Sequence, residues 1–176
     1  SVMVAALVAW TPLEGAQWEL TDGPYGGRVY DLLATPDGTL YVGLADSDGV
    51  YRSDDNGEAW RNLDIPQLEH GAKGLAYGAG RLYAHAYFGR VAVSTDRGES
   101  WAPLYPPDGC SYLAANDLAL FSVLTQDWGS TLYRSLDGGE NWTRVFHLQR
   151  RAYVGPLAFQ GQDIYLGSSH GLFRTS

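Results

Sequence analysis

The chain has 176 residues, of which 45% are hydrophobic and 13% aromatic, and this predicts one globular domain and excludes a disordered chain. Twenty acidic residues against twelve basic ones give a net charge of −8, so we expect no nucleic-acid partner, because such a chain repels phosphate backbones. The single cysteine, Cys110, excludes an internal disulfide framework and a cysteine-based metal cluster, and we expect a buried thiol.

The longest apolar run lies at the N-terminus, from Val2 to Trp10. It is about half as long as a transmembrane helix, so we predict no membrane span. No basic residue precedes the run and no A-x-A cleavage site follows it, which argues against a signal peptide. We expect a β-strand at about Val2–Trp10 and a second strand at about Ala16–Thr21.

One octapeptide pattern, S-x-D-x-G-x-x-W, occurs three times at intervals of 41 residues: Ser53–Trp60, Ser94–Trp101 and Ser135–Trp142. We call each copy a box. A partial copy, Thr11–Trp18, keeps the hydroxyl, the glycine and the tryptophan but has Leu13 in place of aspartate, and Thr175 corresponds to the first residue of a fifth copy. Self-similarity with this period is typical of repeat architectures.

Four short β-rich segments fill each interval. In the first repeat they are Val29–Thr35, Thr39–Ala45, Gly49–Ser53 and Ala59–Leu63, which we call strands A to D, and turn sequences separate them. Four strands in about 41 residues correspond to one propeller blade. We therefore predict an all-β, single-domain β-propeller over residues 1–176, built of four-stranded antiparallel blades. The predicted repeats are about 22–63, 64–104, 105–145, and 146–176 together with 1–21. The ring is expected to be closed by the N-terminal strand or completed by another chain.

The box is interpreted as a structural turn between strands C and D. Its glycine permits a positive φ, its aspartate and serine bond to the backbone of the turn, and its tryptophan folds beneath the turn to fill the gap to the next blade. The residues concerned are Ser53, Asp55, Gly57, Trp60, Ser94, Asp96, Gly98, Trp101, Ser135, Asp137, Gly139 and Trp142. The aspartates lack the oxygen spacing of an EF-hand loop, so we predict no metal site and no cofactor.

The repeated box resembles the Asp-box, or BNR repeat, of sialidase-like β-propellers, and the resemblance covers nearly the whole chain. In that family the boxes lie on the face opposite the active site, which implies that they carry no catalysis here. The family includes sialidases, xyloglucan-degrading hydrolases, sortilin-type receptors and photosystem assembly factors, so the resemblance implies a fold and leaves the activity open.

The residues do not reproduce a sialidase site. The F/Y-R-I-P motif is missing, and Arg52, Arg134 and Arg174 repeat beside the boxes, so we expect them near the outside of separate blades. A glycosidase needs two carboxylates across one cleft, and no spacing singles out such a pair. We therefore predict a non-catalytic binding or assembly module outside the cytoplasm, extracellular or periplasmic. The alternative is a glycoside hydrolase, sialidase-like or xyloglucanase-like, or a fragment of one.

The loops between strands B and C vary most in length, and they share a face with the D–A loops, away from the boxes. The candidate binding residues on the B–C loops are Tyr87, Arg90, Asp127, Trp128 and His170. Exposed aromatic rings beside charged groups suit a sugar or a protein partner, although Tyr87 and Phe88 equally suit coverage of a blade edge. Self-association through residues 1–10 is a further expectation.

Overall fold

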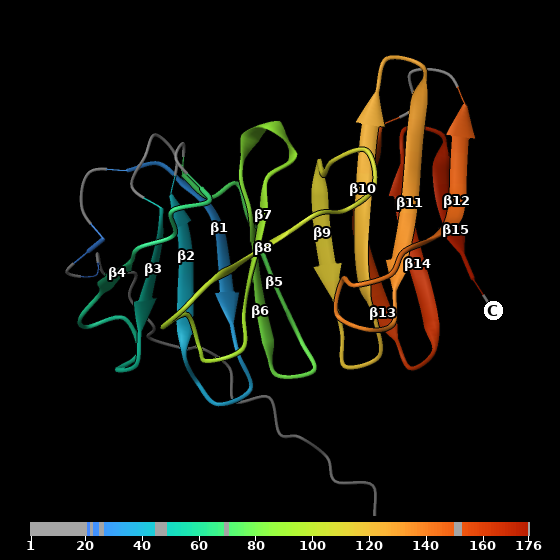
Figure 1. Ribbon diagram of the computed structural model, residues 1–176. Coiled ribbons are helices and arrows are strands. Elements are labelled where there is room, and N and C mark those ends of the chain that lie inside the picture. Colours follow the sequence, from blue (N-terminus) through green and yellow to red (C-terminus); the bar gives the residue numbers. More distant parts are fainter. Residues whose placement is uncertain are drawn as a thin grey trace, which may run out of the picture.

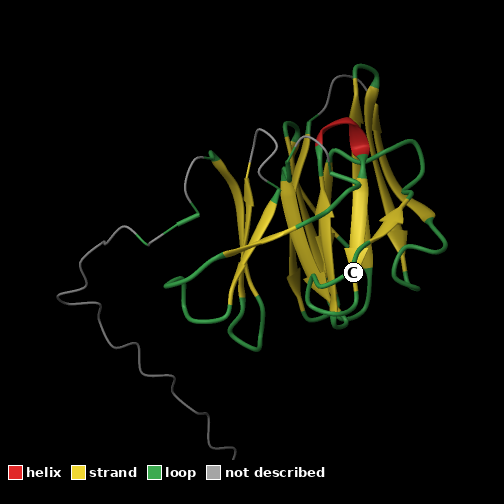
Figure 2. Cartoon of the chain, turned by 60° about the vertical axis from the view of Figure 1, so that its left-hand side comes forward, coloured by secondary structure: helices red, strands yellow, loops and turns green. Residues whose placement is uncertain are grey.

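The computed structural model describes residues 21, 23–24, 27–44, 49–68, 71–149 and 153–175, with the side chain of Tyr87 excepted. The first sheet comprises β1 (Val29–Ala34), β2 (Leu40–Leu44), β3 (Val50–Ser53) and β4 (Arg61–Leu63), and the second β5 (Gly74–Gly78), β6 (Arg81–His85), β7 (Val91–Ser94) and β8 (Ala102–Leu104). The third sheet comprises β9 (Tyr112–Ala115), β10 (Leu120–Gln126), β11 (Gly129–Ser135) and β12 (Thr143–Gln149). The fourth comprises β13 (Val154–Gln160), β14 (Asp163–Ser168) and β15 (Gly171–Arg174). One short 3-10 turn, η1 (Tyr87–Gly89), lies between β6 and β7 (Figure 2).

The four sheets are the blades of a β-propeller, which confirms the predicted fold. Within every sheet each strand pairs with the next one along the chain, antiparallel throughout. The first strands of neighbouring blades contact one another, β1 with β5, β5 with β9 and β9 with β13. The blades therefore follow one another around an axis lined by these strands, and Figure 1 shows the first blade (blue to teal) and the last (orange to red) at opposite ends of the arc.

The hydrophobic core consists of three clusters, each between two adjacent blades. Tyr41, Val50 and Leu63 of the first blade pack against Leu75 and Leu82 of the second. A second cluster joins Tyr83 and Val91 to Leu113 and Leu120, and a third joins Phe121 and Leu132 to Leu157 and Leu166. Since each four-stranded sheet has two apolar faces, a blade is stabilised only by its neighbours, as in other repeat proteins.

Each box forms the hydrogen-bonded turn that its sequence predicts. The serine hydroxyl donates to its aspartate at 2.7 Å and accepts the N–H of the box glycine at 2.9, 2.7 and 2.7 Å in the three copies. The same aspartate oxygen accepts an N–H four residues along at 2.9 Å in every copy. The glycines have φ values of 90°, 88° and 105°, a region that residues with a β-carbon disfavour.

The box tryptophans are less buried than the sequence analysis predicts. Trp60, Trp101 and Trp142 are half-buried, and each indole N–H donates to the carbonyl of its own box glycine at 2.9–3.1 Å. Each indole is therefore bonded to its own turn while part of the residue stays exposed. Trp101 packs against the cluster between the first two blades and Trp142 against the next cluster, so the predicted role as a filler between blades is retained.

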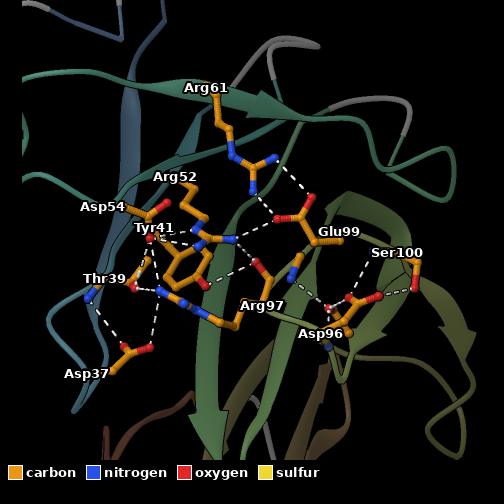
Figure 3. Close-up of polar contacts among 12 residues, drawn as sticks. Asp37, Thr39, Tyr41, Arg52, Asp54, Arg61, Asp96, Arg97, Glu99 and Ser100 are labelled. Carbon is orange, nitrogen blue, oxygen red and sulfur yellow. Dashed lines mark hydrogen bonds and ion pairs between the residues drawn. The ribbon is translucent and has the colours of Figure 1, made fainter.

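A polar network joins the first blade to the box of the second (Figure 3). The Arg52 guanidinium donates to Asp54 within its own blade at 2.7 Å, and to the Arg97 carbonyl and the Glu99 carboxylate of the next box at 3.1 and 3.0 Å. Arg61 also pairs with Glu99. Arg52 lies on β3, the third strand from the axis, and it is only 7% exposed because the next blade covers it.

The fourth blade has three strands among the described residues. The strands predicted at about Val2–Trp10 and Ala16–Thr21 fall outside the described residues, Thr21 excepted, so closure of the ring and self-association through residues 1–10 stay predictions. Within the described part of the chain, no helix has the length and apolar character needed to cross a membrane.

Candidate functional site

The loop face opposite the boxes carries three adjoining cavities that run from the second and third blades toward the propeller axis. We call them the outer, middle and axial cavities, with volumes of about 440, 240 and 390 Å³. The outer and middle cavities share Phe88, Gly89 and Gly109, and the middle and axial cavities share Lys73 and Ser111. Together they form one groove with polar and aromatic walls.

The outer cavity lies between the η1 turn of the second blade and the 105–109 loop that enters the third. Its two aromatic side chains, Phe88 and Tyr105, are 89% and 80% exposed, and Arg90 stands beside them. Phe88 has a φ of 63°, and a β-carbon on Gly89 would lie 2.8 Å from the Cys110 backbone nitrogen. The turn can approach the next blade this closely only with glycine at that position, and the approach leaves the Phe88 ring projecting outward.

The middle cavity joins polar groups to a buried thiol. The Tyr133 hydroxyl donates to Asp108 at 2.9 Å, across the third blade. Cys110 is 5% exposed, and burial raises the pKa of its thiol to about 11. The thiol is therefore protonated at neutral pH and serves as a small apolar side chain of the core, as the sequence analysis predicts.

The axial cavity is lined by the first strands of all four blades. Tyr30 and Asp31 come from β1, Lys73 and Gly74 from the start of β5, Tyr112 from β9, and Tyr153 and Val154 from the start of β13. One Asp31 oxygen accepts the Leu75 N–H at 2.7 Å and the other accepts the Leu32 N–H at 2.9 Å. Asp31 therefore ties the first blade to the second at the axis and uses both oxygens to do so.

His85 closes the wall of the axial cavity beside Gly74, which leaves room for the ring because it has no β-carbon. The side chain is 3% exposed, and its Nδ1 has no hydrogen-bond partner within the described residues. Burial, and secondarily the Lys73 ammonium, lower the pKa of this imidazole to about 4. His85 is thus neutral at pH 7, and one ring nitrogen remains for hydrogen bonding.

The groove suits binding of a polar and partly aromatic ligand. Among the described residues, the carboxylates that line it are Asp108 in the middle cavity and Asp31 in the axial one, and both accept hydrogen bonds from the protein. Among the described residues, no three histidine, cysteine or acidic side chains gather in a way that could hold a metal ion.

Of the predicted site residues, the structure brings Arg90 into this groove. Tyr87 belongs to η1, but its side chain is not described. Asp127 and Trp128 form the tip of the β10–β11 turn, where the indole is 71% exposed, and His170 lies in the β14–β15 turn. None of these three residues lines the three cavities, so their role in binding stays a prediction.

Sequence reasoning missed the axial residues. Lys73 is the one lysine of the chain, and this is the only signal that could have drawn attention to it. Asp31, His85 and Tyr112 lie on strands of three different blades, and no spacing in the sequence connects them.

Comparison with solved structures supports the propeller fold. YCF48 from Cyanidioschyzon merolae matches with a TM-score of 0.72 and 14% identity over 92% of this chain and 57% of that one. A structure of YCF48 bound to D1 peptide matches with a TM-score of 0.65 and 18% identity, over 83% of this chain and 49% of that one. The GH74 xyloglucanase from Xanthomonas campestris matches with a TM-score of 0.61 and 22% identity, over 85% of this chain and 29% of that one.

At these identities the likeness concerns the fold alone, and this chain spans about half of the YCF48 chains and less of the xyloglucanase. No family model matches the sequence, and no curated protein matches it significantly.

Proposed function

We propose that this protein is a non-catalytic binding module that holds an extended segment of a partner protein in the groove on its loop face. The observation that carries the proposal is that Phe88, in the β6–β7 turn, and Tyr105, in the loop from β8 to β9, line one cavity and are both at least 80% exposed. Large aromatic side chains with an arginine beside them are the residues that dominate binding energy at protein interfaces. Side chains of a partner fill such a cavity, and the polar walls further along bind its backbone.

Binding is favoured over hydrolysis by the carboxylates of the groove. A glycoside hydrolase needs one carboxylic acid and one carboxylate facing a shared substrate. Asp31 is held by two backbone N–H groups and Asp108 by the Tyr133 hydroxyl, and they line different cavities. The similar propeller that was solved with a bound peptide adds support, since it is the same fold in a binding role.

The remaining parts of the proposal rest on the sequence. Trp128 and Asp127 extend the binding surface beyond the groove, and the protein works outside the cytoplasm. Membership of the Asp-box family, sialidase-like character and secretion are proposals. Cell fractionation followed by detection with an antibody against the protein tests its location.

A peptide-display selection against the immobilised protein tests the function. We expect selected peptides to bind the double variant F88A/Y105A at least tenfold more weakly, because both rings contribute to one contact. The matched control is Leu136→Ala, which removes an apolar side chain that is 69% exposed on the box side and should leave binding unchanged. Equal binding to all three proteins would contradict the proposed groove.

A glycan array and a panel of fluorogenic glycosides, run on the same preparation, separate the alternatives. If the protein binds glycans and no peptide, its partner is a glycan and not a segment of a protein. Turnover of any glycoside would show that the protein is a hydrolase and not a binding module. Asp31 and Asp108 would then be the first candidates for the catalytic carboxylates.

A further inference from the structure

The two exposed aromatic side chains of the outer cavity are held in place by the backbone beneath them. The turn that carries Phe88 is closed by a hydrogen bond of 2.9 Å from the Ala86 N–H to the Arg90 carbonyl. Tyr105 is followed by Pro106, which is buried and fixes the backbone at that point. The positions of both residues are therefore set before a ligand arrives, which lowers the entropic cost of binding.

The backbone around the outer cavity offers little to a partner strand. Val91 is paired with His85 on one side and with Leu104 on the other. Pro103 and Pro106 line the same cavity and have no N–H to donate. Pro103 is also the middle residue of β8, the outer strand of the second blade. Because strand addition needs a row of open N–H and C=O groups along an edge, β8 is a poor template for it.

A partner helix also fits this part of the groove poorly. A helix binds through apolar side chains repeated over at least two turns, which needs a continuous apolar floor. The exposed large hydrophobic side chains of the outer cavity are Phe88 and Tyr105, and the adjoining middle cavity has Lys73 and Asp108 in its wall. The apolar surface therefore ends after the outer cavity.

A polyproline II helix needs neither a strand edge nor a long apolar floor. It makes no internal hydrogen bonds and has three residues per turn, so residues three apart lie on one side of it, about 9 Å from each other. Proline-rich segments in this conformation bind to grooves lined by aromatic side chains. Their carbonyl groups stay open to donors, and the Tyr105 hydroxyl and the Arg90 guanidinium are donors at the cavity.

Arg90 also gives the outer cavity a positive charge. Of the residues that line this cavity in the described part of the chain, none carries a carboxylate. A guanidinium has five N–H donors, so Arg90 can bind a partner's carboxylate in addition to contacts within the protein. The chain as a whole carries a net charge of −8, but charges more than about 8 Å away are largely screened at physiological ionic strength.

We propose that the segment held in this groove is proline-rich and adopts a polyproline II helix, with prolines on Phe88 and Tyr105 and an acidic residue between them at Arg90. The inference rests on the proposed function and names the class of partner that the groove selects.

Titration of the protein with synthetic peptides, followed by NMR chemical-shift changes, tests the partner class. The probe is the capped peptide Gly-Pro-Pro-Glu-Pro-Pro-Gly, which has two pairs of prolines three residues apart. Replacing its four prolines with alanine should weaken binding about tenfold, because the apolar rings and the preformed helix are lost together. Replacing its glutamate with lysine should weaken binding about threefold, because a cation then faces Arg90.

Two variants assign these effects to the cavity. F88A/Y105A should lose the preference for proline over alanine. Arg90→Gln should lose the preference for glutamate over lysine and keep the preference for proline. Leu136→Ala, on the box side, is the control and should keep both. A thermal melt of each variant confirms that it is folded.

Equal binding of the proline and alanine peptides would overturn the inference, as would a preference for glutamate that survives Arg90→Gln. The peptide-display selection described above separates this failure from failure of the proposed function. Selected peptides that need Phe88 and Tyr105 but contain no proline, or that bind where the synthetic probe does not, would overturn the proline-rich partner and leave the groove. If no peptide depends on these two residues, the proposed function fails and this inference fails with it.

Discussion

The side chain of Leu63 in β4 packs against Gly98 in the box of the following blade, so closely that a β-carbon on Gly98 would lie 2.5 Å from Leu63 Cδ1. Gly98 also has a φ of 88°. The repeated glycine therefore meets two requirements, a left-handed turn within its own blade and a close approach by the preceding one.

Gly98→Ala should destabilise the protein by about 2–5 kcal/mol, because a left-handed conformation costs alanine about 1–2 kcal/mol and overpacking adds about 1–3. Urea unfolding monitored by tryptophan fluorescence measures the loss. The matched control is Gly80→Ala, since Gly80 has a φ of 72° and nothing within 4 Å of an added β-carbon. Equal losses at the two positions would show that the interblade contact contributes nothing.

Arg52→Met should lower the free energy of unfolding by about 2–3 kcal/mol, since it removes charge-assisted hydrogen bonds to Asp54, Glu99 and the Arg97 carbonyl. Arg174 occupies the equivalent position in the last blade, but it is 59% exposed and pairs with Asp163. Arg174→Met should therefore cost less than about 1 kcal/mol. Chemical denaturation of both variants checks the difference, and a larger loss for Arg174→Met would contradict the network in Figure 3.

Stability should fall with acid because of His85. Its pKa is about 4 in the folded protein against an ordinary value of 6.5, so the unfolded chain binds the proton more readily. The stability that depends on neutral His85 is fully present above pH 6.5. It is lost as the pH falls toward 4, and the loss is at most about 3 kcal/mol. Urea unfolding across this range measures the slope.

His85→Gln should flatten that slope. The carboxylate of Asp96, whose pKa is about 2 because Ser100 and Ser94 hydrogen-bond to it, titrates below this range. The stability that ionised Asp96 contributes is lost only as the pH falls from 3.8 through 2. A variant with the full wild-type slope between pH 6.5 and 4 would assign the acid sensitivity to another group.

Cys110 should react slowly with Ellman's reagent in the folded protein and rapidly in urea. The thiol is buried, and the raised pKa keeps it protonated, whereas the thiolate is the reactive form. The ratio of the two rates reports how often the core between the second and third blades opens. Rapid reaction of the native protein would contradict the burial.

Trp128→Ala should leave the free energy of unfolding within about 1 kcal/mol of wild type, because the indole is 71% exposed at the tip of the β10–β11 turn. The same substitution should weaken partner binding if the binding surface extends beyond the groove. Thermal denaturation and titration with a selected peptide measure the two effects separately. A large loss of stability would identify Trp128 as a core residue.

The strands and turns of the blades can be predicted from local sequence patterns. Each box is a local structure in which serine, aspartate and glycine lie within five residues of one another, so the hydrogen bonds of the turn follow from the spacing alone. Turn signals and alternating β-rich segments then separate the strands, and the period of 41 residues indicates the length of one blade. The tryptophans were only partly predicted, because their exposure depends on the neighbouring blade.

The side chains that meet on the loop face could not be predicted from the sequence, because they depend on how the blades pack. Phe88 and Tyr105 share a cavity because packing brings the β6–β7 turn and the β8–β9 loop side by side. Asp31, Lys73, His85 and Tyr112 meet at the axis from three blades. Trp128 was predicted as a site residue because it lies on a B–C loop. In the structure its loop does not line the groove, which loops of other blades form. The physical reason is that contacts within a blade are local in sequence, whereas the packing angle between blades arises from side chains about 40 residues apart.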